Sequence, residues 1–242
     1  METLAAVAFI VVVAAIFAGV ITLVVVVGRR NRRSRGDRQA LMALARERGW
    51  SYRQSDVGTA DRYRGSHPFP QISHNLRVSD LVTGDFRGRA CRGFELRRLV
   101  GTPGNRRGAD RRMYEYYRVF AMATPLTGAS LEIRAAGVGD KLLRKLGRRG
   151  QVGGSVVTDP EFRQRFEVTG DEALARALLR TDVQRWLLTD PRAQQLPLRF
   201  VDDEVITWQR GRLRPDTVDP ALQWLSEVVD RVSSAGWQGD RP

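Results

Sequence analysis

A long apolar run near the start of the chain limits what the protein can be more than any other feature of its sequence. Leu4–Val27 holds 24 residues without a charge or a proline, interrupted only by one glycine and one threonine. As an α-helix rising about 1.5 Å per residue it would be roughly 36 Å long, more than the roughly 30 Å hydrocarbon core of a bilayer. A cleaved signal peptide would instead begin with basic residues and carry a shorter apolar stretch, whereas Met1–Thr3 contains only Glu2. The run therefore predicts an uncleaved transmembrane anchor over residues 1–28.

A cluster of arginines follows the anchor and predicts its orientation. Basic residues collect on the cytoplasmic side of membrane helices, and the opposite end of this one carries only the terminal amine and Glu2. We therefore expect a single-pass protein of the cell inner membrane, with its N-terminus outside and residues 39–242 in the cytoplasm. Residues 29–38 are too charged to pack and should form a linker. The arginines of this cluster are Arg29, Arg30, Arg32, Arg33, Arg35 and Arg38.

Charge is distributed unevenly along the rest of the chain. Lys and Arg total 40 against 27 Asp and Glu, a formal net charge of +13, and nearly all of the bases are arginines. An arginine bias of this kind can reflect a GC-rich genome rather than a chosen chemistry. Its distribution is more informative: residues 86–150 hold 16 bases and five acids, a net +11, whereas residues 151–242 hold 12 and 15, a net −3. The contrast indicates an anionic partner, or two parts of the chain that face one another.

Hydrophobic patterning predicts an α+β domain built on an antiparallel sheet with flanking helices. Four segments with strand-like alternation follow one another across turns or a loop tip, which is the arrangement of an antiparallel meander. The third of them is apolar on both faces, which is typical of a central strand. The four segments are Asp80–Phe86, Ala90–Val100, Met113–Thr124 and Leu131–Ala135.

Helix and turn signals mark the remaining elements. Glycine stops, capping boxes and a proline at the first helical position are the ends that helices prefer. Acidic residues clustered between two apolar runs are typical of a hairpin tip. A boundary within the domain is expected near residues 147–157. The predicted elements are a helix from Asp37 to Gly49, a helical turn at Asp61–Tyr63, helices opened by capping boxes at Thr158–Glu161 and Thr181–Gln184, a hairpin over Pro197–Trp208 that turns at Asp202–Glu204, and a last helix over Asp219–Val232.

Several segments of the chain are similar to a known group of proteins. The segment Asp159–Asp171, DPEFRQRFEVTGD, carries a phenylalanine pattern F-x-x-x-F-x-V ahead of predicted helices and a hairpin. Together with the anchor and three further segments, it resembles uncharacterised membrane-anchored proteins of actinobacteria, from a bacterial family built on a domain of unknown function. The resemblance covers nearly the whole chain and implies the α+β architecture and an inner-membrane location, but it carries no catalytic assignment. The three further segments are Leu41–Tyr52, Val82–Ala90 and Trp208–Leu213.

Side chains suited to catalysis or metal binding are few. His67 and His74, the only two histidines, lie seven residues apart in a loop-like stretch, without the short ligand spacings of zinc sites. Cys91, the only cysteine, has arginine neighbours that would lower a thiol pKa, but at the start of a strand a cysteine is more often a small buried hydrophobe. The glycine-rich stretch 147–154 lacks the ending of a phosphate-binding loop. The sequence therefore predicts no catalytic residue, no metal site and no cofactor.

The remaining signal is clustered positive charge. Residues 140–149 have the pattern of a short amphipathic basic helix, in which bases surround three leucines. Such a helix suits anionic lipid head groups, as does the arginine cluster after the anchor; solvated surface arginines are the simpler alternative. Nucleic acid is disfavoured as a partner, because no reader motif is present and the anchor holds the domain near lipid. The residues predicted to contact anions or lipid are Arg29, Arg30, Arg32, Arg33, Arg35, Lys141, Arg144, Lys145, Arg148 and Arg149.

These features favour a non-enzymatic, membrane-anchored binding or scaffold domain, which contacts anionic lipid or a membrane protein partner. The alternative is an enzyme that acts on a membrane-linked anionic substrate held by arginines. A pocket in which an acid, a base or a nucleophile converge would indicate the enzyme, and a flat sheet with a basic rim would indicate the binding domain.

Overall fold

The computed structural model describes residues 35–71, 75–99, 113–126, 128, 130–137, 157 and 159–233. The predicted anchor, the arginines before Arg35 and the predicted basic helix with Lys141, Arg144, Lys145, Arg148 and Arg149 lie outside these residues, so those predictions stay predictions. Within the described ranges, no helix has the length and apolar character needed to cross a membrane.

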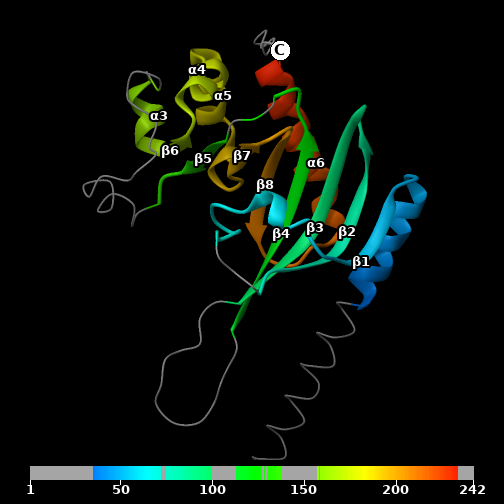
Figure 1. Ribbon diagram of the computed structural model, residues 1–242. Coiled ribbons are helices and arrows are strands. Elements are labelled where there is room, and N and C mark those ends of the chain that lie inside the picture. The colour runs from blue at the N-terminus through cyan, green and yellow to red at the C-terminus, as the bar shows by residue number, and fades with distance from the viewer. Residues whose placement is uncertain are drawn as a thin grey trace, which may run out of the picture.

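The domain is built on one eight-stranded sheet in which every neighbouring pair of strands is antiparallel (Figure 1). The strands lie in the order β1-β2-β3-β4-β8-β7-β5-β6. The predicted α+β class, with an antiparallel sheet and flanking helices, is confirmed. The bounds are β1 Ser51–Asp56, β2 Arg77–Phe86, β3 Arg89–Leu99, β4 Tyr114–Ala123, β5 Leu131–Ala135, β6 Phe166–Gly170, β7 Leu198–Val201 and β8 Glu204–Arg210.

The predicted meander is correct from β2 to β4 and wrong for the fourth predicted strand. The fourth segment does form a strand, β5, but β4 pairs with β8 and β5 lies between β7 and β6. β8 pairs with β4 over seven residues, from Tyr117 to Ala123. β5 has only five residues and could not pair over this length. β4 is therefore central, as predicted, but its second neighbour comes from the end of the chain.

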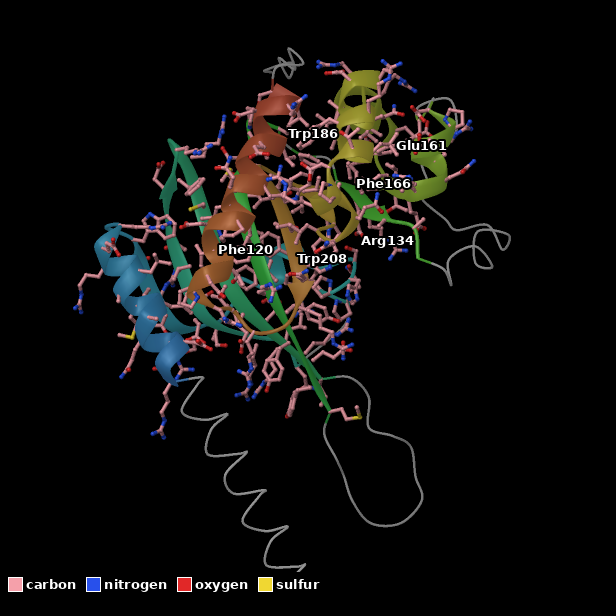
Figure 2. All side chains as sticks on the ribbon, turned by 180° about the vertical axis from the view of Figure 1, so that it is seen from behind. Phe120, Arg134, Glu161, Phe166, Trp186 and Trp208 are labelled. Atoms are coloured by element: carbon pink, nitrogen blue, oxygen red, sulfur yellow. The ribbon has the colours of Figure 1, made fainter. Side chains whose placement is uncertain are left out.

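Each face of the sheet has its own hydrophobic core. β4 shows the division, because Phe120 and Met122 point to one face while Val119 and Ala121 point to the other, as their alternation predicts. Figure 2 shows α6 and a helix over residues 35–47 in front of the first face, which we call the helix face. Residues 57–71 cover the opposite face, the segment face, through Tyr63 and Phe69.

α6, Pro215–Ser233, lies against β4 and β8 on the helix face. Its buried stripe was predicted, but its predicted start at Asp219 is wrong, because the helix begins at Pro215 and contains Pro220. Pro215 already supplies the proline that a first turn accepts, so Pro220 lies inside the helix and cannot donate a hydrogen bond to the Asp216 carbonyl. Asp219 therefore does not start the helix. Its carboxylate accepts from Arg48 at 2.5 Å and so joins α6 to the end of helix 35–47.

Three short helices and a 3-10 turn lie at the end of the sheet formed by β5 and β6 (Figure 1). Asp159 caps the first of them through two backbone N–H groups, so the predicted box opening at Thr158 is wrong. The predicted box at Thr181–Gln184 is also wrong, since the buried Gln184 donates to the Leu179 carbonyl at 2.5 Å and accepts from the Asp159 N–H at 3.2 Å. The bounds are α3 Pro160–Arg165, α4 Glu172–Leu178, α5 Thr181–Thr189 and η2 Pro191–Gln194.

The other predicted elements are confirmed with small shifts. Helix 35–47 ends before Gly49, whose φ of +67° is the left-handed conformation of a glycine stop. The predicted helical turn is η1, Asp61–Tyr63. The predicted hairpin turns at Asp202 and Asp203, but Glu204 lies inside β8 and is buried, so it does not belong to the exposed tip.

Candidate lipid-facing site

Five arginines and two tyrosines gather at one end of the sheet. The starts of β2 and β4 and the last residues of β3 and β8 meet there, because the register pairs Arg77 with Arg97 and Arg97 with Tyr116. Just after β8, Gly211 donates its N–H to the Tyr116 carbonyl at 2.8 Å. We call this region the arginine–tyrosine end; its residues are Arg77, Arg97, Arg98, Tyr114, Tyr116, Arg210 and Arg212.

Three of these arginines lie over tyrosine rings of β4. A guanidinium within about 6 Å of a ring centroid is attracted to the face of the ring and is held parallel to it. The distances are 4.6 Å for Arg97 over Tyr114, 5.5 Å for Arg98 over Tyr117 and 3.7 Å for Arg212 over Tyr116. The tyrosines therefore fix the arginines in place without neutralising their charge.

Two carboxylates neutralise part of the positive charge. Glu115 binds Arg98 at 2.7 Å and Arg210 at 3.0 Å, and the hydrogen bond from Arg98 holds the pKa of Glu115 below its usual range. Glu95, only 3% exposed, binds Arg212 at 2.8 Å, although burial raises the pKa of this carboxyl group. Five arginines against two carboxylates leave this end with a charge of about +3 at neutral pH.

Two of the three remaining positive charges belong to Arg77 and Arg97. The third is shared by Arg98 and Arg210, which both bind Glu115. Neither Arg77 nor Arg97 has a carboxylate partner among the residues that the structure describes. Arg77 is exposed at the first position of β2, and Arg97 pairs with it across the strands. Two unneutralised guanidinium groups therefore lie side by side at the rim of the sheet.

Exposed apolar surface adjoins these arginines. Met113 is 59% exposed and Tyr114 is 37% exposed, and they are two of the four large hydrophobic residues that are exposed in the described ranges. Tyrosine beside arginine is typical of the boundary between lipid and water, where an apolar body and a charged or polar tip are both satisfied. The arginine–tyrosine end therefore has the composition of a membrane-interface surface.

The described chain begins beside this same end. Arg38 donates from Nε to Asp80 Oδ1 at 2.8 Å, and the Tyr52 hydroxyl donates to the same oxygen at 2.5 Å. These bonds hold the start of helix 35–47 against the first residues of β2. Arg35, the one predicted lipid-contact residue that the structure describes, is exposed at this helix start.

None of the seven residues of the arginine–tyrosine end was predicted from the sequence. A signal was present, since Arg97 and Arg98 end one predicted strand while Tyr114 and Tyr116 open the next. An antiparallel pair brings such residues together. The register that adds Arg77 and Arg210 could only come from the fold.

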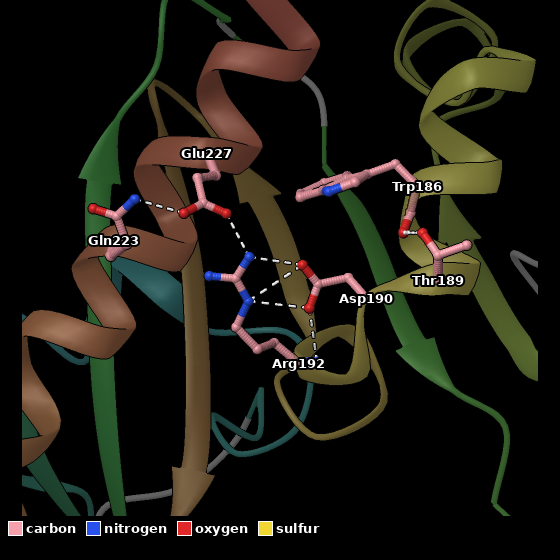
Figure 3. A network of polar contacts seen from close by, with 6 residues as sticks. All are labelled: Trp186, Thr189, Asp190, Arg192, Gln223 and Glu227. Carbon is pink, nitrogen blue, oxygen red and sulfur yellow. Dashed lines mark hydrogen bonds and ion pairs between the residues drawn. The ribbon is translucent and has the colours of Figure 1, made fainter.

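A second polar cluster joins η2 to α6 (Figure 3). Arg192 donates from Nε and Nη2 to Asp190 at 3.0 and 2.7 Å and also binds Glu227 of α6. Hydrogen bonds from Arg192 lower the pKa of both carboxyl groups, so both stay ionised at neutral pH. The guanidinium lies 4.9 Å from the Trp224 ring, which stacks on Trp186 at 5.1 Å. This cluster fixes the position of η2 over the helix face.

Cys91 and His67 do not form a reactive site, and His74 lies outside the described residues. Cys91 is buried in the core of the helix face, and burial raises its pKa to about 11, so its thiol is protonated at neutral pH. His67 stacks edge-on against Tyr117, which belongs to the core of the segment face. The two side chains therefore lie on opposite faces of the sheet. The described ranges also contain no cluster of three or more His, Cys, Asp or Glu side chains that could hold a metal ion.

Comparison with known proteins gives one structural likeness. No protein-family model matches the chain, and no curated protein matches it. The crystal structure of the mycobacterial trehalose monomycolate transport factor A, TtfA, matches with a TM-score of 0.53 and 14% identity, over 82% of this chain and 96% of that one. The match comes from an actinobacterial protein, which agrees in part with the resemblance seen in the sequence. At this identity the likeness shows that the two chains share their fold.

Proposed function

We propose that the protein is a non-enzymatic, membrane-tethered binding domain on the cytoplasmic side of the inner membrane, which takes part in the transport of an envelope lipid. In this proposal Leu4–Val27 spans the bilayer, and the arginine–tyrosine end faces the anionic lipid surface.

The observation that carries the proposal is the position of the arginine–tyrosine end beside the start of helix 35–47, the described element that follows the predicted anchor and linker in the sequence. The eight residues from Gly28 to Arg35 can span at most about 28 Å at roughly 3.5 Å each. Arg38 binds Asp80 in β2 and so keeps one end of the sheet at the start of helix 35–47. In the proposal, this is the end that lies nearest to the anchor. Each arginine close to an anionic leaflet contributes on the order of 1 kcal/mol, within a Debye length of about 8 Å.

The fold supports the transport part of the proposal. TtfA is named for trehalose monomycolate transport, and 96% of its chain is covered by the match. Since 14% identity carries the fold alone, the cargo proposed for this chain is a lipid of the cell envelope as a class.

The separation of Cys91 from His67 supports a non-enzymatic role. A nucleophile and its base must come within hydrogen-bond reach of one another, and these two side chains lie on opposite faces of a sheet. The alternative enzyme would therefore need a base other than His67 to activate Cys91.

Depletion of the protein in its source bacterium tests the proposal. We expect newly labelled envelope lipid to accumulate in the inner membrane and to fall in the outer envelope fraction, as measured after a pulse of labelled acetate. The full chain should restore the distribution, and so should a variant with His67→Ala, His74→Ala and Cys91→Ala. Residues 39–242 without the anchor should not restore it.

Two outcomes would count against this function. An unchanged lipid distribution after depletion would remove the transport role. A folded triple variant that fails to restore transport would favour the enzyme alternative.

A further inference from the structure

A groove lies on the helix face, next to the arginine–tyrosine end, where the first turns of α6 pass over β4 and β8. Its volume is about 210 Å³. Phe120 and Thr207 line its strand side, Ala221 lines the side of α6, and Leu196 closes it from the segment after η2. Arg192, held by the cluster of Figure 3, also lines it and so fixes that wall.

Thr207 is a buried polar residue among those that line this groove. Its side chain is fully buried, and its hydroxyl has no hydrogen-bond partner in the described part of the chain. Leaving a buried hydroxyl without a partner costs on the order of 1 to 3 kcal/mol. A valine would have nearly the same shape without that cost, so the hydroxyl is better explained by a partner that enters the groove.

Arg118 supplies a positive charge beside this hydroxyl. Its pKa is lowered mainly by burial, although the nearby Asp216 carboxylate acts to raise it, and its hydrogen bond goes to the uncharged Gln209 rather than to a carboxylate. β4 pairs Arg118 with Gln209 and Phe120 with Thr207, so Arg118 and Thr207 are one strand repeat apart, about 7 Å. A half-buried guanidinium without an ion pair is unusual, because buried charges are normally paired.

Arg192 is bound by Asp190 and Glu227, and Asp216 is bound by Arg214 at 2.7 Å. Together with Arg118, three guanidinium groups therefore meet three carboxylates around the groove. Arg118 is the one of the three without an ion pair to a described carboxylate, and the remaining lining is mainly apolar. We propose that this groove binds a small monoanionic carboxylate with a short apolar body, its carboxylate on Arg118 and the Thr207 hydroxyl, and its apolar part against Phe120 and Leu196.

The size and place of the groove favour a free small molecule over a peptide. About 210 Å³ equals the liquid volume of roughly seven waters, below the roughly 300 Å³ at which drug-sized pockets begin. Both strands under the groove are paired on both sides, so no strand edge is free to take up an extended peptide. The inference does not depend on lipid transport and concerns a different surface.

Methyl NMR on the full chain in nanodiscs tests the proposal, with alanine and threonine methyl groups labelled. Hexanoate should give saturable shifts of the Thr207, Thr217 and Ala221 methyl signals. Hexanamide, which has the same shape without the charge, should bind about tenfold or more weakly, because a hydrogen bond to a charged group is the stronger kind. Inorganic phosphate, a dianion without an apolar body, should not give these shifts.

Variants of the two polar residues separate this site from general charge effects. Arg118→Gln should abolish the preference for hexanoate over hexanamide, whereas Arg185→Gln on the exposed face of α5 should not. Thr207→Val should weaken hexanoate binding several-fold while its melting temperature without hexanoate stays equal or rises. Equal binding of hexanoate and hexanamide, or hexanoate binding that Arg118→Gln leaves unchanged, would overturn the proposal, as would the absence of saturable shifts.

Discussion

Replacing Glu204 by alanine is expected to lower the free energy of unfolding by about 2 to 4 kcal/mol, because the buried Tyr63 hydroxyl loses its acceptor and Arg92 loses its carboxylate partner. Glu204 is 5% exposed, and its carboxylate accepts from the Tyr63 hydroxyl at 2.6 Å. The same carboxylate binds Arg62 at 3.2 Å and Arg92 at 2.9 Å. It therefore joins the segment over residues 57–71 to two strands. Urea unfolding of the full chain in detergent, followed by tryptophan fluorescence, measures the change.

The neighbouring residue provides a matched control. Asp203 also binds Arg62, but its side chain is 58% exposed, and exposed ion pairs contribute at most about 1 kcal/mol. Asp203→Ala should therefore change the free energy of unfolding by less than this. Similar effects for the two substitutions would mean that Glu204 does not hold the segment to the sheet.

Gly170→Ala is expected to destabilise the domain by roughly 3 to 5 kcal/mol, combining backbone strain with overpacking. Gly170 ends β6 with a φ of +129°, which side chains rarely adopt. A Cβ there would lie 2.1 Å from the Ser130 carbonyl oxygen, and this oxygen is held in place because it accepts from the Asp171 N–H at 2.9 Å. Backbone atoms cannot turn away as a side chain can, so β5 and β6 would have to separate.

Gly88→Ala is the control that separates the cost of backbone strain from the cost of the steric clash with Ser130. Its φ of +78° is also left-handed, but a Cβ there would meet nothing within 4 Å. Gly88→Ala should therefore cost only about 1 to 2 kcal/mol, the cost of a left-handed conformation. If Gly170→Ala costs no more than Gly88→Ala in the same urea titration, the close approach of β5 and β6 is incorrect.

The sequence predicts those parts of the fold that depend on local pattern. The alternation of apolar residues along β4 predicts that Phe120 and Val119 point to opposite faces of a central strand. In the structure each lies in the hydrophobic core of its own face. Glycine with positive φ at the end of helix 35–47 and the Asp202 turn follow from backbone chemistry that acts within a few residues. Such features need no knowledge of the rest of the chain.

Pairing between distant strands was not predictable in the same way. β5 follows β4 in sequence, yet β8 takes the place beside β4, because an eight-stranded order is decided by strand length and by the burial of both faces. Gln184 shows the same limit on a smaller scale. A glutamine three residues after a threonine suggests a capping box, but its burial directs the amide to Leu179 instead.

The same limit applies to the candidate site. The sequence shows that arginines cluster, but it does not show which carboxylates bind them. Glu115 and Glu95 bind three of the five arginines and neutralise two positive charges, only because β3, β4, the end of β8 and the residues after it lie side by side. Within the described residues, Arg77 and Arg97 remain without a carboxylate partner, and no local pattern distinguishes them from the others.

The orientation of the arginine–tyrosine end toward lipid is the central claim, and the methionines of the chain can test it directly. Met113 lies exposed beside this end, while Met122 is buried about 30 Å further along β4. Methyl-labelled methionine in the full chain is observed in nanodiscs that contain anionic lipid and a small fraction of lipid with a gadolinium chelate on its head group. The paramagnetic ion broadens signals near the bilayer surface.

We predict strong broadening of the Met113 signal and little broadening of the Met122 signal. The Met113 effect should fall in zwitterionic nanodiscs and in the double variant Arg77→Gln and Arg97→Gln. It should persist when the exposed Arg176 and Arg185, on α4 and α5, are changed to glutamine as a matched loss of charge. Broadening of Met122 equal to that of Met113, or a Met113 signal indifferent to lipid charge, would contradict the account.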